Sequence, residues 1–117
     1  MRIKIGFRGK KVSIGAKELS NLGMFRGLMV RGKNCDNLLF NRKGKWAIHS
    51  FFVFFPFLAL WLDENNDVIE HKIVKPFSFH VKPERNFVKL VEMPFNDKNK
   101  QTIDFLVDRE RFKYIAE

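Results

Sequence analysis

The segment that decides the fold is residues 46–62, WAIHSFFVFFPFLALWL, which carries no formal charge. As an extended chain it is largely apolar on both faces, which is typical of a central strand that is covered on both sides. Pro56 has no N–H to donate to a neighbouring strand, and it ends the run. The segment therefore predicts two central strands, one before Pro56 and one over residues 57–62.

A membrane-spanning helix is the alternative for this segment. Seventeen uncharged residues reach the lower limit for such a helix, and basic residues precede the segment while acids follow it. However, His49, Ser50 and Pro56 lie inside it. The sequence on both sides also alternates with the period of strands, and a sheet needs a buried centre. We therefore favour the sheet.

The flanking sequence predicts the remaining elements. Apolar–polar alternation indicates a hairpin over residues 2–14 and strands over residues 37–40, 68–74 and 87–93. Apolar residues at steps of three and four predict one short helix within residues 15–29. Residues 94–100 are expected to be a loose loop, and residues 101–115 fit either a strand or a helix. Together these elements predict a single domain, residues 1–117, that is mainly β: a small antiparallel sandwich or partly closed barrel with one or two short helices.

Positive charge is concentrated ahead of the apolar segment. The net charge is +9, with a balance of +10 in residues 1–46 and −1 in residues 47–117. A basic region of this kind can meet nucleic acid, anionic lipid or an acidic partner, and solvated lysines without a partner are the alternative. Nucleic-acid contacts would come from two basic turns, which contain Arg8, Lys10, Lys11, Arg42, Lys43 and Lys45.

Residues that commonly carry catalysis or bind metals are few. His49, His71 and His80 do not lie at metal-ligand spacings. Arg31, Lys33 and Asp36 lie near the single Cys35, but the sequence gives no triad. We predict no catalytic residue, no metal and no cofactor; an enzyme that uses His49 with Cys35 is the weakest hypothesis. One cysteine and a basic first segment predict a cytoplasmic protein.

His49 is the strongest single candidate for function. It lies in the predicted central strand, so we expect a buried imidazole that is hydrogen-bonded to backbone. Such a group carries a desolvation cost that another interaction must offset.

Two segments resemble the uncharacterised archaeal and bacterial domain-of-unknown-function family 192. Residues 26–31, RGLMVR, are similar to the family's RGLMFR, and residues 48–63, IHSFFVFFPFLALWLD, are similar to its archaeal form IHTFFMRFPIDVVFLD. Weaker matches occur at residues 76–77, PF, and 91–94, VEMP, near the family's PW and LELP. The resemblance covers residues 15–95 and leaves residues 96–117 uncovered.

The resemblance implies an all-β sandwich or small barrel with short helices, and no established activity. Val53, Phe54 and Leu58 stand where the family carries a methionine, a basic residue and an aspartate. This chain therefore lacks the charged pair that best fits a polar site. Without that charged pair, the remaining ligand-binding candidates are His49, Arg26 and Arg31.

The sequence thus predicts a small non-enzymatic β-domain, a binding or accessory module of unknown ligand. The alternative is a nucleic-acid-binding protein that uses the basic first 46 residues.

Overall fold

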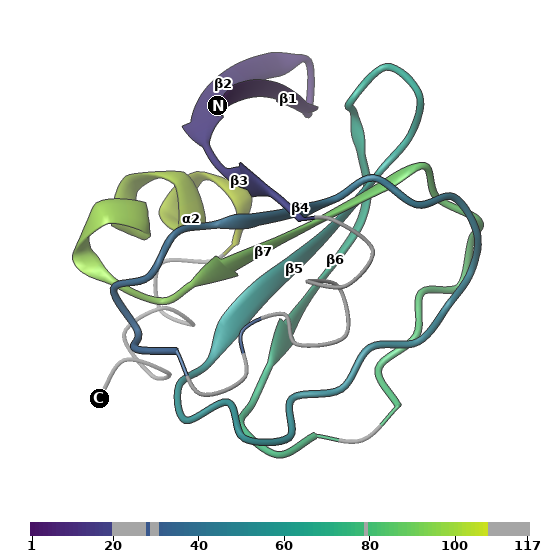
Figure 1. Cartoon of the computed structure of the whole chain (residues 1–117). Coiled ribbons are helices and arrows are strands. Elements are labelled where there is room, and N and C mark those ends of the chain that lie inside the picture. The colour runs from purple at the N-terminus through teal and green to yellow at the C-terminus, as the bar shows by residue number, and fades with distance from the viewer. Residues whose placement is uncertain (20–27, 29–30, 79, 108–117) are drawn as a thin grey trace.

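The structure, a computed structural model, describes residues 1–19, 28, 31–78 and 80–107. Strands β3, β4, β7, β5 and β6 form, in that order, a five-stranded sheet, and β1 and β2 form a separate hairpin (Figure 1). Neighbours in the larger sheet are antiparallel, except for the parallel pair β3 and β4. The elements are β1 (Arg2–Phe7), β2 (Lys10–Gly15), β3 (Lys17–Glu18), β4 (Leu38–Phe40), β5 (Phe57–Leu62), β6 (Val68–Val74), β7 (Lys89–Pro94), the 3₁₀ turn η1 (Asp97–Asn99) and α2 (Lys100–Leu106).

The mainly β prediction is confirmed, and the strands of the described residues do not close into a barrel. β5 lies inside the larger sheet, between β7 and β6, and all of its side chains are buried. Its leucines face one side of the sheet, while Phe57, Ala59 and Trp61 face the other. The predicted central strand over residues 57–62 is therefore confirmed.

The apolar residues before Pro56 do not form a strand, so that prediction is wrong. Ile48 makes only an isolated bridge to Val81, and the chain turns at Phe51 and Phe52. The turn reverses the alternation of buried and exposed side chains. This part of the segment covers the sheet instead of joining it.

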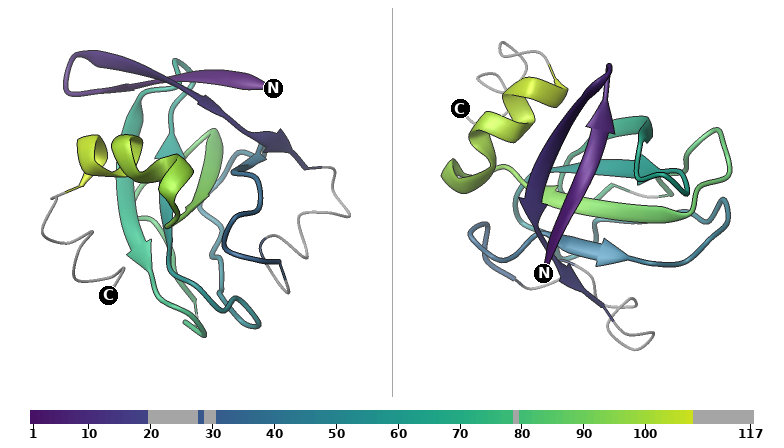
Figure 2. Two further views of the ribbon diagram at one scale, coloured as in Figure 1. Left: turned by 90° about the vertical axis from the view of Figure 1, so that its left-hand side faces the viewer. Right: turned by 90° about the horizontal axis from the view of Figure 1, so that it is seen from above.

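The two faces of the sheet are covered by different kinds of structure. The β1–β2 hairpin and α2 cover one face, where Ile5 and Ile103 pack with the leucines of β5. Figure 2 shows the hairpin crossing over the larger sheet with α2 beside it. Loops cover the other face, where Val53, Phe55 and Phe87 pack around Trp61. The centre of the sheet is thus buried on both sides.

Two predictions for other segments also change. Gly15 ends β2 and residues 17–18 form β3, whereas residues 20–27 and 29 of the predicted helix lie outside the described residues. Residues 94–100 are not loose but complete β7 and form η1 and the start of α2. Asn96 explains this, because its Oδ1 accepts a hydrogen bond from the N–H of Asn99 at 3.0 Å and caps the turn.

Residues 101–115 are helical as far as Leu106, and residues 108–117 are outside the described part of the chain. Among the helices of the described residues, none has the length and apolar character needed to cross a membrane.

Candidate functional site

His49 lies in the loop before Pro56 with an exposed side chain, so the prediction of a buried histidine is wrong. Its Nδ1 accepts a hydrogen bond from the backbone N–H of Phe51 at 3.2 Å. The expected backbone partner thus exists, but in a solvated loop. The bridge between Ile48 and Val81 brings the exposed His80 onto the neighbouring segment. His49 therefore belongs to a surface that two loops build together.

These two loops carry an exposed cluster of phenylalanines. Phe52 and Phe54 come from the loop between β4 and β5, and Phe77 comes from the loop between β6 and β7. Their side chains are 54%, 62% and 48% exposed, respectively. The Phe77 ring meets the other two edge-on, with centroid distances of 6.4 Å to Phe52 and 5.4 Å to Phe54. We call these three residues the aromatic patch; both loops reach the lower edge of Figure 1, away from the hairpin.

Ser50, which is fully buried, ties the two loops together. Its Oγ donates to the carbonyl of Lys75 and accepts from the N–H of Ser78, both at 2.6 Å. Its carbonyl accepts from the N–H of Phe77 at 2.9 Å and from that of Val53 at 3.2 Å. Because one side chain and its peptide group bond four backbone groups, the aromatic patch stands on a defined scaffold.

The backbone at the aromatic patch is strained. Phe52 and Phe77 each have φ of 58°, in the left-handed region. For a bulky residue this conformation is an outlier that costs about 1–2 kcal/mol. Because about half of each ring stays exposed, burial of apolar surface offsets little of this cost. Strain of this kind gathers at functional sites, where the surrounding structure holds it in place.

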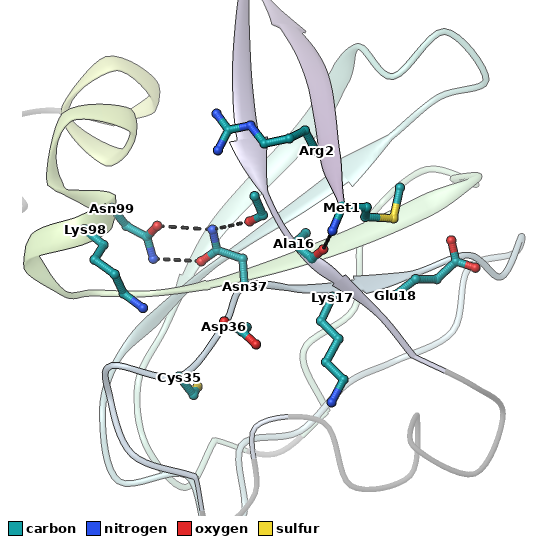
Figure 3. Close-up of a pocket in the computed structure, with 11 residues that line it drawn as sticks. Met1, Arg2, Ala16, Lys17, Glu18, Cys35, Asp36, Asn37, Lys98 and Asn99 are labelled. Carbon is teal, nitrogen blue, oxygen red and sulfur yellow. Dashed lines mark hydrogen bonds between the residues drawn. The ribbon is translucent and has the colours of Figure 1, made fainter.

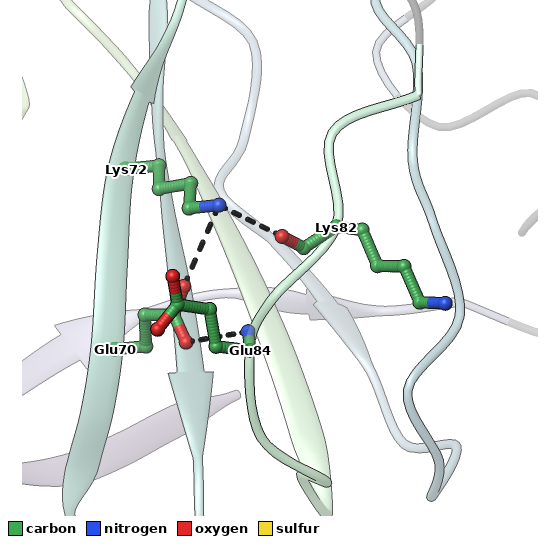
Figure 4. A network of polar contacts seen from close by, with 4 residues as sticks. All are labelled: Glu70, Lys72, Lys82 and Glu84. Atoms are coloured by element: carbon green, nitrogen blue, oxygen red, sulfur yellow. Dashed lines mark hydrogen bonds and ion pairs between the residues drawn. The ribbon is translucent and has the colours of Figure 1, made fainter.

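The chain segments that carry the aromatic patch contain lysines, and Glu70 and the exposed Glu84 border them. Residues 46–62 and 71–83 contain no Asp or Glu. Lys75 and Lys82 are exposed there. The carbonyl of Lys82 accepts from Nζ of Lys72 at 2.7 Å, and Lys72 also pairs with Glu70 at 3.6 Å. In the same network, the backbone N–H of Glu84 donates to Glu70 Oε1 at 2.9 Å. Figure 4 shows that the Lys82 side chain points away from these contacts.

The two predicted basic turns lie at the opposite end of the sheet. All six of their cations are exposed: Arg8, Lys10, Lys11, Arg42, Lys43 and Lys45. A series of backbone contacts runs between them, from Gly44 to Phe87, from Val88 to Leu62 and from Asp67 to Gly6. The acidic turn over residues 63–67 therefore stands between the basic turns, and they do not form one continuous surface.

The remaining ligand candidates do not join His49. Arg31 is half-buried beside Cys35, where its guanidinium acts on the thiol, and Arg26 is outside the described residues. Burial raises the pKa of the Cys35 thiol, and the opposing effect of Arg31 is smaller. The thiol is thus protonated near neutral pH, and His49 is not among the residues that line its pocket.

That pocket, of about 690 Å³, lies where the hairpin, β3, residues 35–37 and η1 meet. Its wall contains a reciprocal amide pair: Asn37 donates to Asn99 Oδ1 at 3.1 Å, and Asn99 donates to Asn37 Oδ1 at 2.7 Å (Figure 3). Each amide also donates to a carbonyl at 2.8 Å, of Gly15 and Pro94 respectively. Because the protein itself uses these donors, the pair is a structural link rather than a ligand site.

Glu92, on β7, is the polar residue that the sequence reasoning missed. It lies between Leu38 and Ala59 in register and is 4% exposed. Burial raises the pKa of Glu92 to about 8, so its carboxyl is largely protonated at neutral pH. Trp61 faces the same side, and its buried indole N–H has no acceptor in the described structure. A lone acid inside the apolar run of residues 90–95 was the available signal.

Within the described residues, no group of three or more His, Cys, Asp or Glu side chains is placed to hold a metal ion. The site that the geometry builds is therefore the aromatic patch with the exposed Lys75 on the same loop as Phe77.

Two solved structures share this fold. One is a protein of unknown function from Novosphingobium aromaticivorans DSM 12444, with a TM-score of 0.69 and 10% identity, which covers 86% of this chain and 76% of that one. The other is described as a "putative transcription regulator" from Sinorhizobium meliloti 1021, with a TM-score of 0.69, 15% identity and coverage of 86% and 82%. No protein-family profile and no curated protein matches the chain. At these identities the likeness shows the fold alone.

Proposed function

We propose that the protein is a small non-enzymatic binding module whose contact surface is the aromatic patch. The observation that carries this proposal is the pair of strained, exposed phenylalanines, Phe52 and Phe77, on a scaffold built around the buried Ser50. Exposed apolar clusters mark contact surfaces, and strain that brings no burial indicates selection for something other than stability.

Replacement of Phe52 and Phe77 by Asn tests the proposal. Asn adopts left-handed backbone more readily than Phe, so relief of strain should offset the lost ring contacts. We expect the free energy of unfolding, measured by urea denaturation, to stay within about 1 kcal/mol of the parent. Binding of the apolar dye 1-anilinonaphthalene-8-sulfonate should fall in the same variants.

The matched control is Phe87→Ala, at a ring that is 2% exposed. A buried phenylalanine should cost about 3–5 kcal/mol when it is truncated. If Phe52→Asn and Phe77→Asn destabilise the protein as much as this control, the aromatic patch is a structural feature and the proposal fails.

Nucleic-acid binding through the basic turns is the second candidate function. The exposed cations of the turn at residues 8–11 favour it, with Arg8 and Gly9 held at positive φ. A labelled oligonucleotide should then bind at low salt and dissociate steeply as salt rises. Absence of binding at low salt would eliminate this function.

We also infer that the chain is related to domain-of-unknown-function family 192. The similarity of residues 26–31 and 48–63, with their spacing, supports this relation. A solved structure of a family member whose two motifs superpose in register on these segments would test it.

A further inference from the structure

The aromatic patch combines exposed apolar side chains with exposed lysines on the neighbouring chain segments, and this combination points to one class of partner. We propose that the aromatic patch docks the protein on the surface of an anionic lipid bilayer. This inference rests on the proposed function, because it names the partner of the same surface.

Local charge favours an anionic surface. The chain segments that carry the aromatic patch hold exposed Lys75 and Lys82 and no acid between residues 71 and 83 or between residues 46 and 62. Two acids border the second segment: Glu70 pairs with Lys72, and Glu84 is exposed, so residues 70–84 still hold more lysines than acids. Lysines beside a bilayer add attraction to anionic headgroups, while apolar side chains enter the boundary between headgroups and acyl chains. Phe suits that depth because its ring has no polar tip that must stay in water.

The size of the aromatic patch favours a bilayer over a protein partner. Three phenylalanines that are each about half exposed present on the order of 300 Å² of apolar surface. A stable protein interface buries about 800 Å² on each partner, so the aromatic patch alone is too small for a second copy of the chain or another folded protein. Contact with a bilayer needs no such minimum area, because a few apolar side chains can enter the bilayer by themselves.

The arrangement of the rings disfavours nucleic acid. Proteins that bind single strands offer flat ring faces along a basic groove. Here the rings meet edge-on, at interplanar angles of 69° and 72°. The centre of the sheet is covered on both faces, and the basic turns lie at the other end of the sheet. The aromatic patch therefore lacks both the platform and the groove.

Co-sedimentation of the full chain with vesicles tests the proposal. We expect binding to phosphatidylcholine vesicles that contain phosphatidylserine, and little binding to phosphatidylcholine alone. Added salt should weaken the binding without abolishing it, because the apolar contribution is not screened. The triple variant Phe52→Asn, Phe54→Ser and Phe77→Asn should bind at least about tenfold more weakly.

Two charge variants locate the contact. Lys75→Gln with Lys82→Gln should weaken vesicle binding by several-fold, because each lysine near the surface contributes to it. Arg8→Gln with Lys10→Gln and Lys11→Gln removes more charge at the far end of the sheet and should change binding less. A larger loss in the second variant would show that net charge, not the aromatic patch, drives binding, and would overturn the proposal.

Soluble glycerophosphoserine and a single-stranded oligonucleotide distinguish a bilayer from the two other possible partners, a free phosphate compound and nucleic acid. If the soluble headgroup competes fully with vesicles, the partner is a free phosphate compound and not a bilayer. If the triple phenylalanine variant loses oligonucleotide binding while vesicles never bind, the partner is nucleic acid. Absence of vesicle binding overturns this inference, whereas the proposed function fails separately, through the unfolding measurements on Phe52→Asn and Phe77→Asn.

Discussion

At the scale of single residues, Glu92 is a buried acid whose pKa is raised far above its ordinary value. Its carboxyl sits on the interior strand β7, beside the small Ala59 and the buried Leu38. No ion pair of Glu92 is formed within the described residues. Ionisation inside this apolar layer is costly, and the proton therefore stays on the carboxyl.

Stability should consequently fall as pH rises. The pKa of Glu92 is raised from 4.5 to about 8 in the folded protein, so between these values the folded state holds a proton that the unfolded state releases. We expect Glu92 to cost on the order of 4 kcal/mol of unfolding free energy across this window. Below the window the carboxyl is neutral in both states, and the cost vanishes.

The measurement is urea denaturation of the parent and of Glu92→Gln at several pH values. Glu92→Gln should remove this pH dependence and should be the more stable protein above pH 8. Parallel curves for the two proteins would contradict the buried, protonated carboxyl.

At the scale of elements, the two loops at residues 50–54 and 75–78 act as one unit because Ser50 joins them. The serine supplies a donor for the carbonyl of Lys75 and an acceptor for the N–H of Ser78. Ser50→Ala removes both bonds: the N–H of Ser78 loses its acceptor in a part-buried site, and the Lys75 carbonyl keeps only the bond from the Ser78 hydroxyl. We expect a loss of about 2–4 kcal/mol in the free energy of unfolding, together with weaker dye binding at the aromatic patch.

Ser78→Ala is the matched control for this element. The Ser78 hydroxyl donates to the same Lys75 carbonyl at 2.8 Å, but it is solvated. Water can replace it, so we expect a change of under about 1 kcal/mol. Equal effects of the two substitutions would show that Ser50 has no special role in joining the loops.

At the scale of the whole molecule, Asn37 and Asn99 link regions that are far apart in the sequence. Through Gly15 and Pro94 the pair joins the hairpin, the segment before β4, the end of β7 and the start of α2. These two side chains therefore add a polar link between elements that also pack together through the apolar core.

A double-mutant cycle measures this link. Asn37→Ala and Asn99→Ala should each destabilise the protein by about 1–3 kcal/mol. Their effects should not add, with a coupling of about 1–2 kcal/mol, because each substitution already breaks the shared hydrogen bonds. Additive effects in thermal or urea unfolding would contradict a direct link.

Sequence patterns found the elements that local periodicity dictates. The hairpin can be predicted because alternation along β1 reports which side chains are buried. β5 is buried along its whole length, and its uninterrupted apolar run predicts it. From the sequence, residues 101–115 fit either a strand or a helix. The helix at residues 100–106 continues the η1 turn, which depends on the cap made by Asn96 and on the contact between Asn99 and Asn37.

The candidate site was less readable. The sequence singles out His49, but as a buried strand residue, and it places Phe52 and Phe54 in a central strand, whereas the structure exposes all three. Nothing local to residues 51–54 distinguishes a buried Phe from an exposed one. The distinction depends on Ser50 bonding a loop that lies 25 residues or more away.

The sequence by itself therefore determined that this chain is a mainly β protein, built around an uncharged apolar segment and carrying its positive charge ahead of it. The tertiary structure alone decided that only residues 57–62 of that segment enter the sheet, while the part before Pro56 covers it and exposes Phe52 and Phe54. The physical reason is that periodicity is a property of neighbouring residues. Burial and exposure at a loop are set instead by hydrogen bonds and packing between segments that are distant in the chain.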